Sequence, residues 1–149
     1  MDQKTRNEAF NNYIRTLFDS DDWKDRAIAA QNIGKLKEAR ATNILARALK
    51  SENDRVVINQ IIEALGEIRD PKATIIIIDI LQEEVKKPEV DQDKTRLFII
   101  IESLMKIGDK RALKHLGVLL DSCHNDIRKL TEEAFECIDP EWKLNVKSI

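Results

Sequence analysis

Four side chains in this sequence have the reactivity to ligate a metal ion or to act in nucleophilic catalysis: Cys123, Cys137, His115 and His124. Cys123 and His124 are adjacent, which is poor geometry for joint zinc ligation, and no Cys-x-x-Cys motif supplies the other ligands of a tetrahedral site. The sequence also lacks a Gly-x-Ser-x-Gly motif and a phosphate-binding glycine loop. We therefore expect no catalytic residue, no metal site and no cofactor.

A second set of candidates is a row of cations, each preceded by an acidic residue two positions earlier. The cations are Arg40, Lys72 and Arg111, and the acids are Glu38, Asp70 and Asp109. Such a row of cations can bind phosphates. The paired acids instead favour a structural ladder of charge-assisted hydrogen bonds, which would neutralise cations that otherwise oppose a helix dipole. We predict the structural ladder and keep phosphate binding as the alternative.

The elements that position these charges belong to an internal repeat. The segment GEIRDPKA (66–73) aligns with GKLKEARA (34–41) at an offset of 32 residues, and MKIGDKRA (105–112) follows at a further 39. Two columns keep these steps, and they consist of Ala9, Ala41, Ala73 and Ala112, and of Leu17, Leu49, Leu81 and Leu120. Agreement of columns over most of the chain indicates a genuine repeat.

Each repeat unit is predicted to be a pair of helices. Residues that can cap a helix N-terminus precede each first helix, namely Asp21 and Asp22, Asn53 and Asp54, Asp93, and Asn125 or Asp126. Apolar residues follow at helical spacing, and Pro71 suits the first position of a second helix. A hairpin cannot bury its apolar stripe alone, so neighbouring hairpins must stack. We predict an all-α fold, a short right-handed α-solenoid of about eight helices.

The repeat also sets the predicted domain boundaries. We expect a single domain over residues 1–149, with a capping helix at about 4–19, units at about 22–50, 54–87 and 93–121, and an atypical cap at 125–149. The longer step of 39 residues places an insertion at about 84–92, where Pro88 must end or interrupt a helix. Inserted loops in repeat arrays often belong to the binding face, but tolerated drift explains the insertion equally well.

Three segments carry a resemblance to a known family: AIAAQNIGKLKEARATNILARAL, IIEALGEIRDPKATIIIIDIL and IIESLMKIGDKRALKHLGVLL. Over roughly residues 9–139 the chain resembles the HEAT-like repeats named after phycobilisome lyases. The resemblance implies an α-solenoid whose second helices line a concave surface, in a family of scaffolds, chromophore-handling proteins, enzymes and nucleic-acid binders. Two departures stand out: Met105 replaces the glycine of the Gly34 and Gly66 column, and bulky Trp142 suggests a terminal cap.

The run of four isoleucines at 75–78 favours a β-strand by residue type, but the repeat places it in a second helix. Ile75 and Ile78 fall on a face expected to be polar, at positions that hold Asn11, Asn43 and Lys114, and Ile14, Ala46 and Gly117, in the other units. The resulting candidate partner-binding face comprises Ile14, Phe18, Ala46, Arg47, Ile75, Ile78, Asp79, Lys114 and Val118. Either this face is an exposed groove for a partner helix or peptide, or Ile75 and Ile78 are buried between adjacent helices.

Composition narrows the class of protein. Charged residues make up 35% and aromatic residues 5%, a balance typical of helical proteins, and a net charge of −2 gives no general attraction to nucleic acid or anionic membranes. No apolar run reaches the length of a membrane span, and the first residues do not resemble a signal peptide. Along one helix, Cys123 and Cys137 would lie about 21 Å apart, too far for a disulfide. Unpaired thiols favour a cytoplasmic protein.

We therefore predict a non-catalytic scaffold or adaptor that binds a protein or peptide on its concave face, with a homodimer through the Ile75/Ile78 face as one form. The alternative, implied only by the family resemblance, is a ligand-handling protein of the phycobilin-lyase type. Nucleic-acid binding ranks last, because it would rest on residues 23–50, where seven cations outnumber two acids. The next stretch, residues 51–92, has five cations against ten acids.

Overall fold

The computed structural model describes residues 2–145, and these fold into nine α-helices and short 3-10 segments, with no strand among them. The all-α prediction is confirmed, and the isoleucine run lies within a helix. No helix in the described part of the chain is long and apolar enough to cross a bilayer. The helices group into two compact units divided between Asp70 and Pro71, which we describe separately. The single domain over 1–149 stays a prediction.

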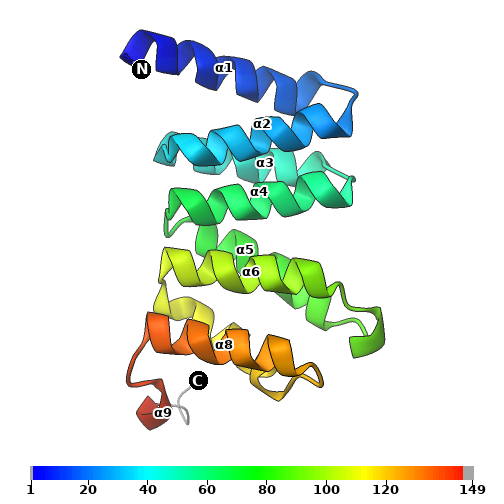
Figure 1. The fold of residues 1–149 in the computed structure, drawn as a ribbon, viewed down its shortest axis with the longest axis vertical. Coiled ribbons are helices and arrows are strands. Elements are labelled where there is room, and N and C mark those ends of the chain that lie inside the picture. Colours follow the sequence, from blue (N-terminus) through cyan, green and yellow to red (C-terminus); the bar gives the residue numbers. More distant parts are fainter. Residues whose placement is uncertain (1, 146–149) are drawn as a thin grey trace. The chain divides into compact units, whose positions relative to one another are not determined.

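The elements of the first unit are α1 (Gln3–Asp19), α2 (Trp23–Leu36), the 3-10 segment η1 (Ala39–Ala41), α3 (Thr42–Ser51) and α4 (Arg55–Ile68). The unit contains one complete helical hairpin, α2 with α3, together with α1 and α4. α2 lies between α1 and α4, and α3 lies behind α2 and α4 (Figure 1). The contact of α2 with α4 is the most extensive in the unit.

The second unit repeats this arrangement with less regular second helices. It contains α5 (Ala73–Val85), η2 (Glu89–Asp91), α6 (Lys94–Ile107), η3 (Lys110–Ala112), α7 (Leu113–Leu116), η4 (Gly117–Asp121), α8 (Asn125–Ile138) and α9 (Trp142–Asn145). α6 and α8 lie side by side, with α5 behind α6 (Figure 1).

Aspartate caps begin three of the four first helices, as predicted. Asp22 accepts from the N–H of Lys24 at 2.9 Å, Asp54 from that of Val56 at 2.8 Å, and Asp93 from that of Arg96 at 3.1 Å. The fourth prediction is wrong by one position, because His124 is the N-cap of α8 and makes no side-chain capping bond. Pro71 also lies in a turn before α5, which begins at Ala73.

The second helix of the third hairpin is broken, where the repeat predicts a continuous helix. After one α-helical turn in α7, residues Gly117–Asp121 tighten into a 3-10 helix. Gly117 occupies the position that holds Ala46 and Ile78 in the neighbouring hairpins. Because glycine in a helix interior lowers helix stability by about 1 kcal/mol relative to alanine, the local break has a sequence cause.

The last described helix covers the end of α8 with an aromatic side chain. Trp142 is buried, its ring lies 5.0 Å from that of Phe135 between centroids, and its indole N–H donates to Glu136 at 2.6 Å. This packing fixes α9 against α8, and the role of Trp142 in a terminal cap stays a prediction. Residues 146–149 of the predicted cap lie outside the described residues.

Close approach of α2 and α4 depends on a glycine. A Cβ atom on Gly34 would lie 2.9 Å from the Cα and Cβ atoms of Ala64 on α4. A backbone atom cannot rotate away as the end of a flexible side chain can, so only glycine fits without moving one helix. At Gly34, the glycine of the repeat therefore has a packing cause.

We predict that Gly34→Val destabilises the protein by about 1–3 kcal/mol, because the added atoms force α2 away from α4. Urea denaturation followed by circular dichroism measures this change. The matched control is Gln31→Val, which places the same side chain at an exposed position of the same helix and should cost about 0.5 kcal/mol or less. Equal losses in the two variants would contradict the packing role of Gly34.

Candidate functional site

In the first unit, the candidate face is formed by α1 and α3. Phe18 is 37% exposed, and the guanidinium of Arg47 lies 5.4 Å from its ring centroid, within reach of a cation–π contact. Ile14, on the same helix as Phe18, and Ala46, on the same helix as Arg47, are half-buried. The unit therefore presents one exposed aromatic side chain beside a cation, a combination common in protein recognition sites.

An open depression of about 510 Å³ lies next to Phe18. Its lining residues are Leu17, Phe18, Ser20, Arg26, Ala48, Ser51, Glu52, Asn53 and Asp54. Arg26 and Glu52 form a two-pronged ion pair there, with N···O distances of 2.9 and 3.0 Å, and their side chains are only 18% and 8% exposed. The candidate residues predicted from sequence include Phe18 but miss this ion pair.

Electrostatics keeps the Glu52 carboxylate charged in the depression. Burial raises the pKa of Glu52, but hydrogen bonds from Arg26 and from the N–H of Asp54 outweigh burial, and the pKa lies below its usual range. Arg26 also donates to the carbonyl of Ser20 at 3.0 Å. The pair thereby fixes the turn before α2 against the turn before α4.

In the second unit, the isoleucines separate. Ile75 is 48% exposed, whereas Ile78 is only 3% exposed. Ile78 follows Thr74 by four residues and precedes Leu81 by three, so it lies on the buried stripe of α5. The structure thus corrects the placement of Ile78 on an exposed partner-binding face and keeps Ile75 as an exposed apolar side chain.

The remaining predicted residues of the second unit are exposed. Val118 on η4 is 55% exposed, and Asp79 on α5 and Lys114 on α7 are exposed charged side chains. The side chains of Gln82 and His115 lie 3.2 Å apart and join α5 to α7, so His115 has a packing and hydrogen-bonding role in this unit. These predicted residues are therefore exposed apolar side chains and exposed charges of both signs, and their grouping into one face stays a prediction.

Glu38 in the first unit joins α1 to the turn between α2 and α3. Glu38 lies 2.6 Å from Arg40 and also 2.6 Å from Arg6 on α1, which additionally donates to the carbonyl of Leu36. The hydrogen bond from Arg6 is the main cause that lowers the pKa of Glu38. Arg40 stacks over Phe10 at 3.9 Å and donates to Asn7. Both cations of this cluster therefore have protein partners.

In the second unit, Arg111 pairs with Asp109 at 2.7 Å and donates to the carbonyl of Pro71 at 3.3 Å. The predicted ion pair between Asp109 and Arg111 is therefore confirmed. Arg111 also connects the turn before α5 to the turn before α7. Its hydrogen bonds lower the pKa of Asp109 to about 2. Asp70 is half-buried and Lys72 is exposed. The contacts of Arg40 and Arg111 favour the structural ladder over a free phosphate-binding row.

The insertion brings together three residues that sequence reasoning left apart. Ligand atoms of Glu89, Cys123 and His124 lie within 4.8 Å of one another. The adjacency of Cys123 and His124 is evident in the sequence, but the contribution of Glu89 depends on how the insertion folds. The extra length of the 39-residue step is the signal that could have directed attention to this loop.

Comparison with known proteins identifies the family. The profile of the HEAT repeats matches residues 13–93, more than half of the chain. The chain belongs to the HEAT repeat family. No curated protein sequence matches this HEAT repeat protein.

One similar solved structure is the complex of CpcE and CpcF of phycocyanin lyase from Nostoc sp. PCC7120. The TM-score is 0.77 at 22% sequence identity, and the match covers 95% of this chain. The HEAT repeat protein spans 57% of the length of that chain. At this level of identity the similarity shows the fold, and the resemblance inferred from the sequence is confirmed.

The burial difference on α5 gives a direct prediction. Ile75→Asp should change the free energy of unfolding by about 0.5 kcal/mol or less, because the side chain is exposed. Ile78→Asp should cost about 3 kcal/mol or more, because it places an unpaired charge on the buried stripe. Urea denaturation of the two variants measures the difference, and equal effects would refute the assigned burial.

A second prediction concerns pH. The pKa of Asp109 is about 2 in the folded protein, below its ordinary value of 3.8. The contacts of the Asp109 carboxylate therefore contribute their full stabilisation at pH values above 3.8, the pKa expected in the unfolded chain. This stabilisation is lost as the pH falls towards about 2, where the carboxylate is protonated in the folded protein as well. The stability difference between wild type and Asp109→Asn should therefore shrink as the pH falls from 3.8 towards about 2. Carboxyl NMR locates the midpoint, and a midpoint at 3.8 would contradict the ion pair.

Proposed function

We propose that this HEAT repeat protein is a non-catalytic scaffold that binds a protein or peptide through exposed side chains of α1 and of the second helices. The observation that carries the proposal is the exposed Phe18, which lies under Arg47 and beside the open depression of the first unit. A peptide could pack an apolar side chain against Phe18 and place a charged side chain near Arg26 or Glu52 in the depression.

The second unit offers a similar surface on a smaller scale. Ile75 on α5 and Val118 on η4 are exposed apolar side chains, and Asp79 on α5 and Lys114 on α7 supply charges. Charges of both signs around apolar side chains favour a partner of complementary mixed charge over a simple polyanion. Self-association through the Ile75 face is one form of this proposal, and the oligomeric mass measured by light scattering tests it.

The comparison supports protein partners. The similar structure from Nostoc is a complex of two proteins, CpcE and CpcF. Stacked HEAT repeat units leave one face of each helix unburied, and such faces are available to bind proteins.

The second candidate function is ligand handling of the phycobilin-lyase type, favoured by the fold similarity to a phycocyanin lyase complex. Its test is spectroscopic. A shift in the visible absorption of a free bilin on addition of the purified protein supports this candidate, and an unchanged spectrum at saturating protein removes it.

We predict that Phe18→Asp and Val118→Asp abolish capture of the native partner, because a charge would have to be desolvated in the contact. Affinity purification from the native host with quantitative mass spectrometry measures capture. The matched control is Val90→Asp, which changes the 90% exposed valine of the insertion. Val118→Asp and Val90→Asp should keep a stability within about 0.5 kcal/mol of wild type, because the replaced side chains are exposed. Phe18→Asp should cost about 1–2 kcal/mol, because Phe18 is only 37% exposed, and circular dichroism verifies that this variant is folded.

Proteins retained by wild type and Val90→Asp but lost from Phe18→Asp and Val118→Asp would be partners of the proposed faces. A set of captured proteins that is the same for wild type, Phe18→Asp and Val118→Asp would contradict the proposal. Reconstitution with the purified partner, measured by calorimetry, then separates direct from indirect capture.

A further inference from the structure

The insertion between α5 and α6 is a loop held in shape by its own hydrogen bonds. Glu84, at the end of α5, is 3% exposed and accepts hydrogen bonds from the N–H of Asp93 at 2.8 Å and from the ammonium of Lys87 at 3.2 Å. Gln92 donates to the carbonyl of Lys87 at 2.9 Å. These contacts close the loop on itself, so the residues at its tip have defined positions.

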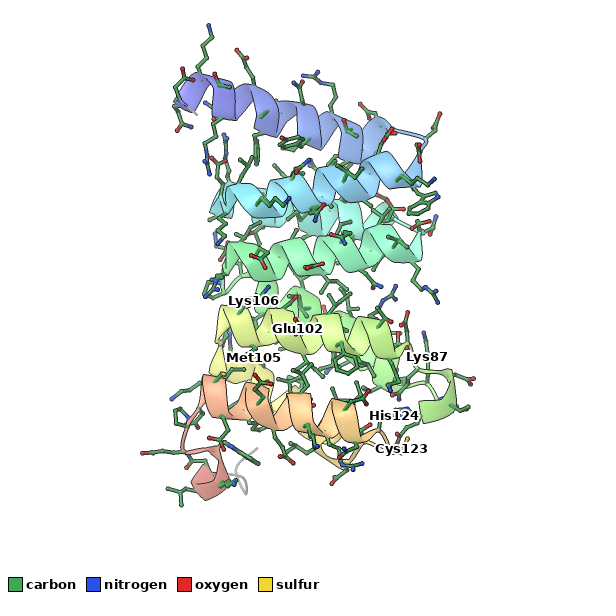
Figure 2. The ribbon with its side chains drawn as sticks, viewed as in Figure 1. Lys87, Glu102, Met105, Lys106, Cys123 and His124 are labelled. Carbon is green, nitrogen blue, oxygen red and sulfur yellow. The ribbon has the colours of Figure 1, made fainter. Side chains whose placement is uncertain are left out.

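The tip of the loop contacts the turn before α8. The carboxylate of Glu89 accepts from the N–H of Cys123 at 2.9 Å, across 34 residues of sequence. Figure 2 shows Cys123 and His124 beside the loop that follows Lys87, at one end of α8. The backbone of His124 is itself held, because its N–H donates to Ser122 at 3.1 Å and its carbonyl accepts from Arg128 at 3.1 Å.

The three side chains supply a thiol, an imidazole and a carboxylate, which are the ligands that zinc prefers in proteins. The adjacency of Cys123 and His124 in the sequence is unfavourable for joint ligation, but in the fold the ligand atoms of all three residues lie within 4.8 Å of one another, so the expectation of poor geometry is corrected. Ligands around a tetrahedral zinc ion lie about 3.5 Å apart, so movements on the order of 1 Å would close the cluster on an ion. Glu89 and Cys123 are exposed and His124 is half-buried, so their side chains have room to rotate.

We propose that Glu89, Cys123 and His124 form a binding site for a divalent transition-metal ion of the zinc class, with the fourth position left to water. A carboxylate has two oxygens, so Glu89 can keep the N–H of Cys123 on one and direct the other to the ion. The proposal is independent of the partner-binding function, because none of these residues belongs to the candidate faces of either unit.

Metal binding at this cluster exchanges a proton for the ion. The thiol proton leaves to solvent when the Cys123 sulfur bonds to the metal ion. Affinity therefore rises with pH, and about one proton is released for each ion bound.

Cobalt(II) titration of the reduced full-length chain tests the proposal, because a cobalt–thiolate bond gives a charge-transfer absorption band. We expect one ion bound per chain, displacement by zinc, and release of one proton measured by calorimetry in buffers of different ionisation enthalpy. Cys123→Ser should lose the charge-transfer band, and Glu89→Gln and His124→Ala should each weaken binding at least about tenfold.

The matched controls are Cys137→Ser, which removes the other exposed thiol, and Glu83→Gln, which removes an exposed carboxylate of α5. Both should bind cobalt as wild type does, and circular dichroism verifies that every variant is folded. A melting temperature that rises with zinc in wild type but not in Cys123→Ser would agree with the site. Absence of binding by wild type, or a charge-transfer band that persists in Cys123→Ser, would overturn the proposal.

Discussion

Small residues at the helix contacts are the constraint on which the rest of this structure depends. Gly34 allows α2 to approach α4 until a single added carbon would lie 2.9 Å from the backbone of Ala64. Ala41 in the first unit, and Ala73 and Ala112 in the second, are fully buried where each second helix starts. Because a helical hairpin cannot bury its apolar stripe alone, such close contacts decide whether neighbouring hairpins stack at all. Ion pairs such as that of Arg6 on α1 with Glu38, in the turn after α2, add contacts between helices that the small residues allow to pack closely.

Packing by small and aliphatic columns leaves other helix positions available for recognition. Phe18 is not required by the core and is 37% exposed beside Arg47 and the depression that contains the Arg26–Glu52 pair. In the second unit, the break at Gly117 changes the second helix to a 3-10 segment and leaves Val118 exposed on it. The insertion adds a further element, because Glu84 anchors a loop whose tip reaches Cys123. The proposed partner binding and the proposed metal binding therefore depend on residues outside the helix-packing columns, namely Phe18, Val118 and the insertion loop.

The sequence alone predicted the all-α fold, the aspartate caps and the helical state of the isoleucine run, because these depend on periodicity and local chemistry. It could not separate Ile75 from Ile78, since residues three positions apart on a helix differ by only about 60° in direction and a small rotation decides which one is buried. It also missed the Arg26–Glu52 pair and the contact of Glu89 with Cys123, because both join residues far apart in sequence. Such contacts depend on how turns and loops meet after the helices pack, which repeat columns do not specify.

The most direct measurement of the central claim, that the exposed face around Phe18 contacts a protein partner, is site-specific photocrosslinking in the native host. A photoreactive phenylalanine derivative replaces Phe18 in one variant and Val90, which is 90% exposed on the insertion, in another. The account predicts a discrete crosslinked protein from position 18 that is absent from position 90. It also predicts that Arg47→Glu, which alters the charge over the Phe18 ring, weakens this crosslink. No crosslink from position 18, or the same products from both positions, would contradict the account.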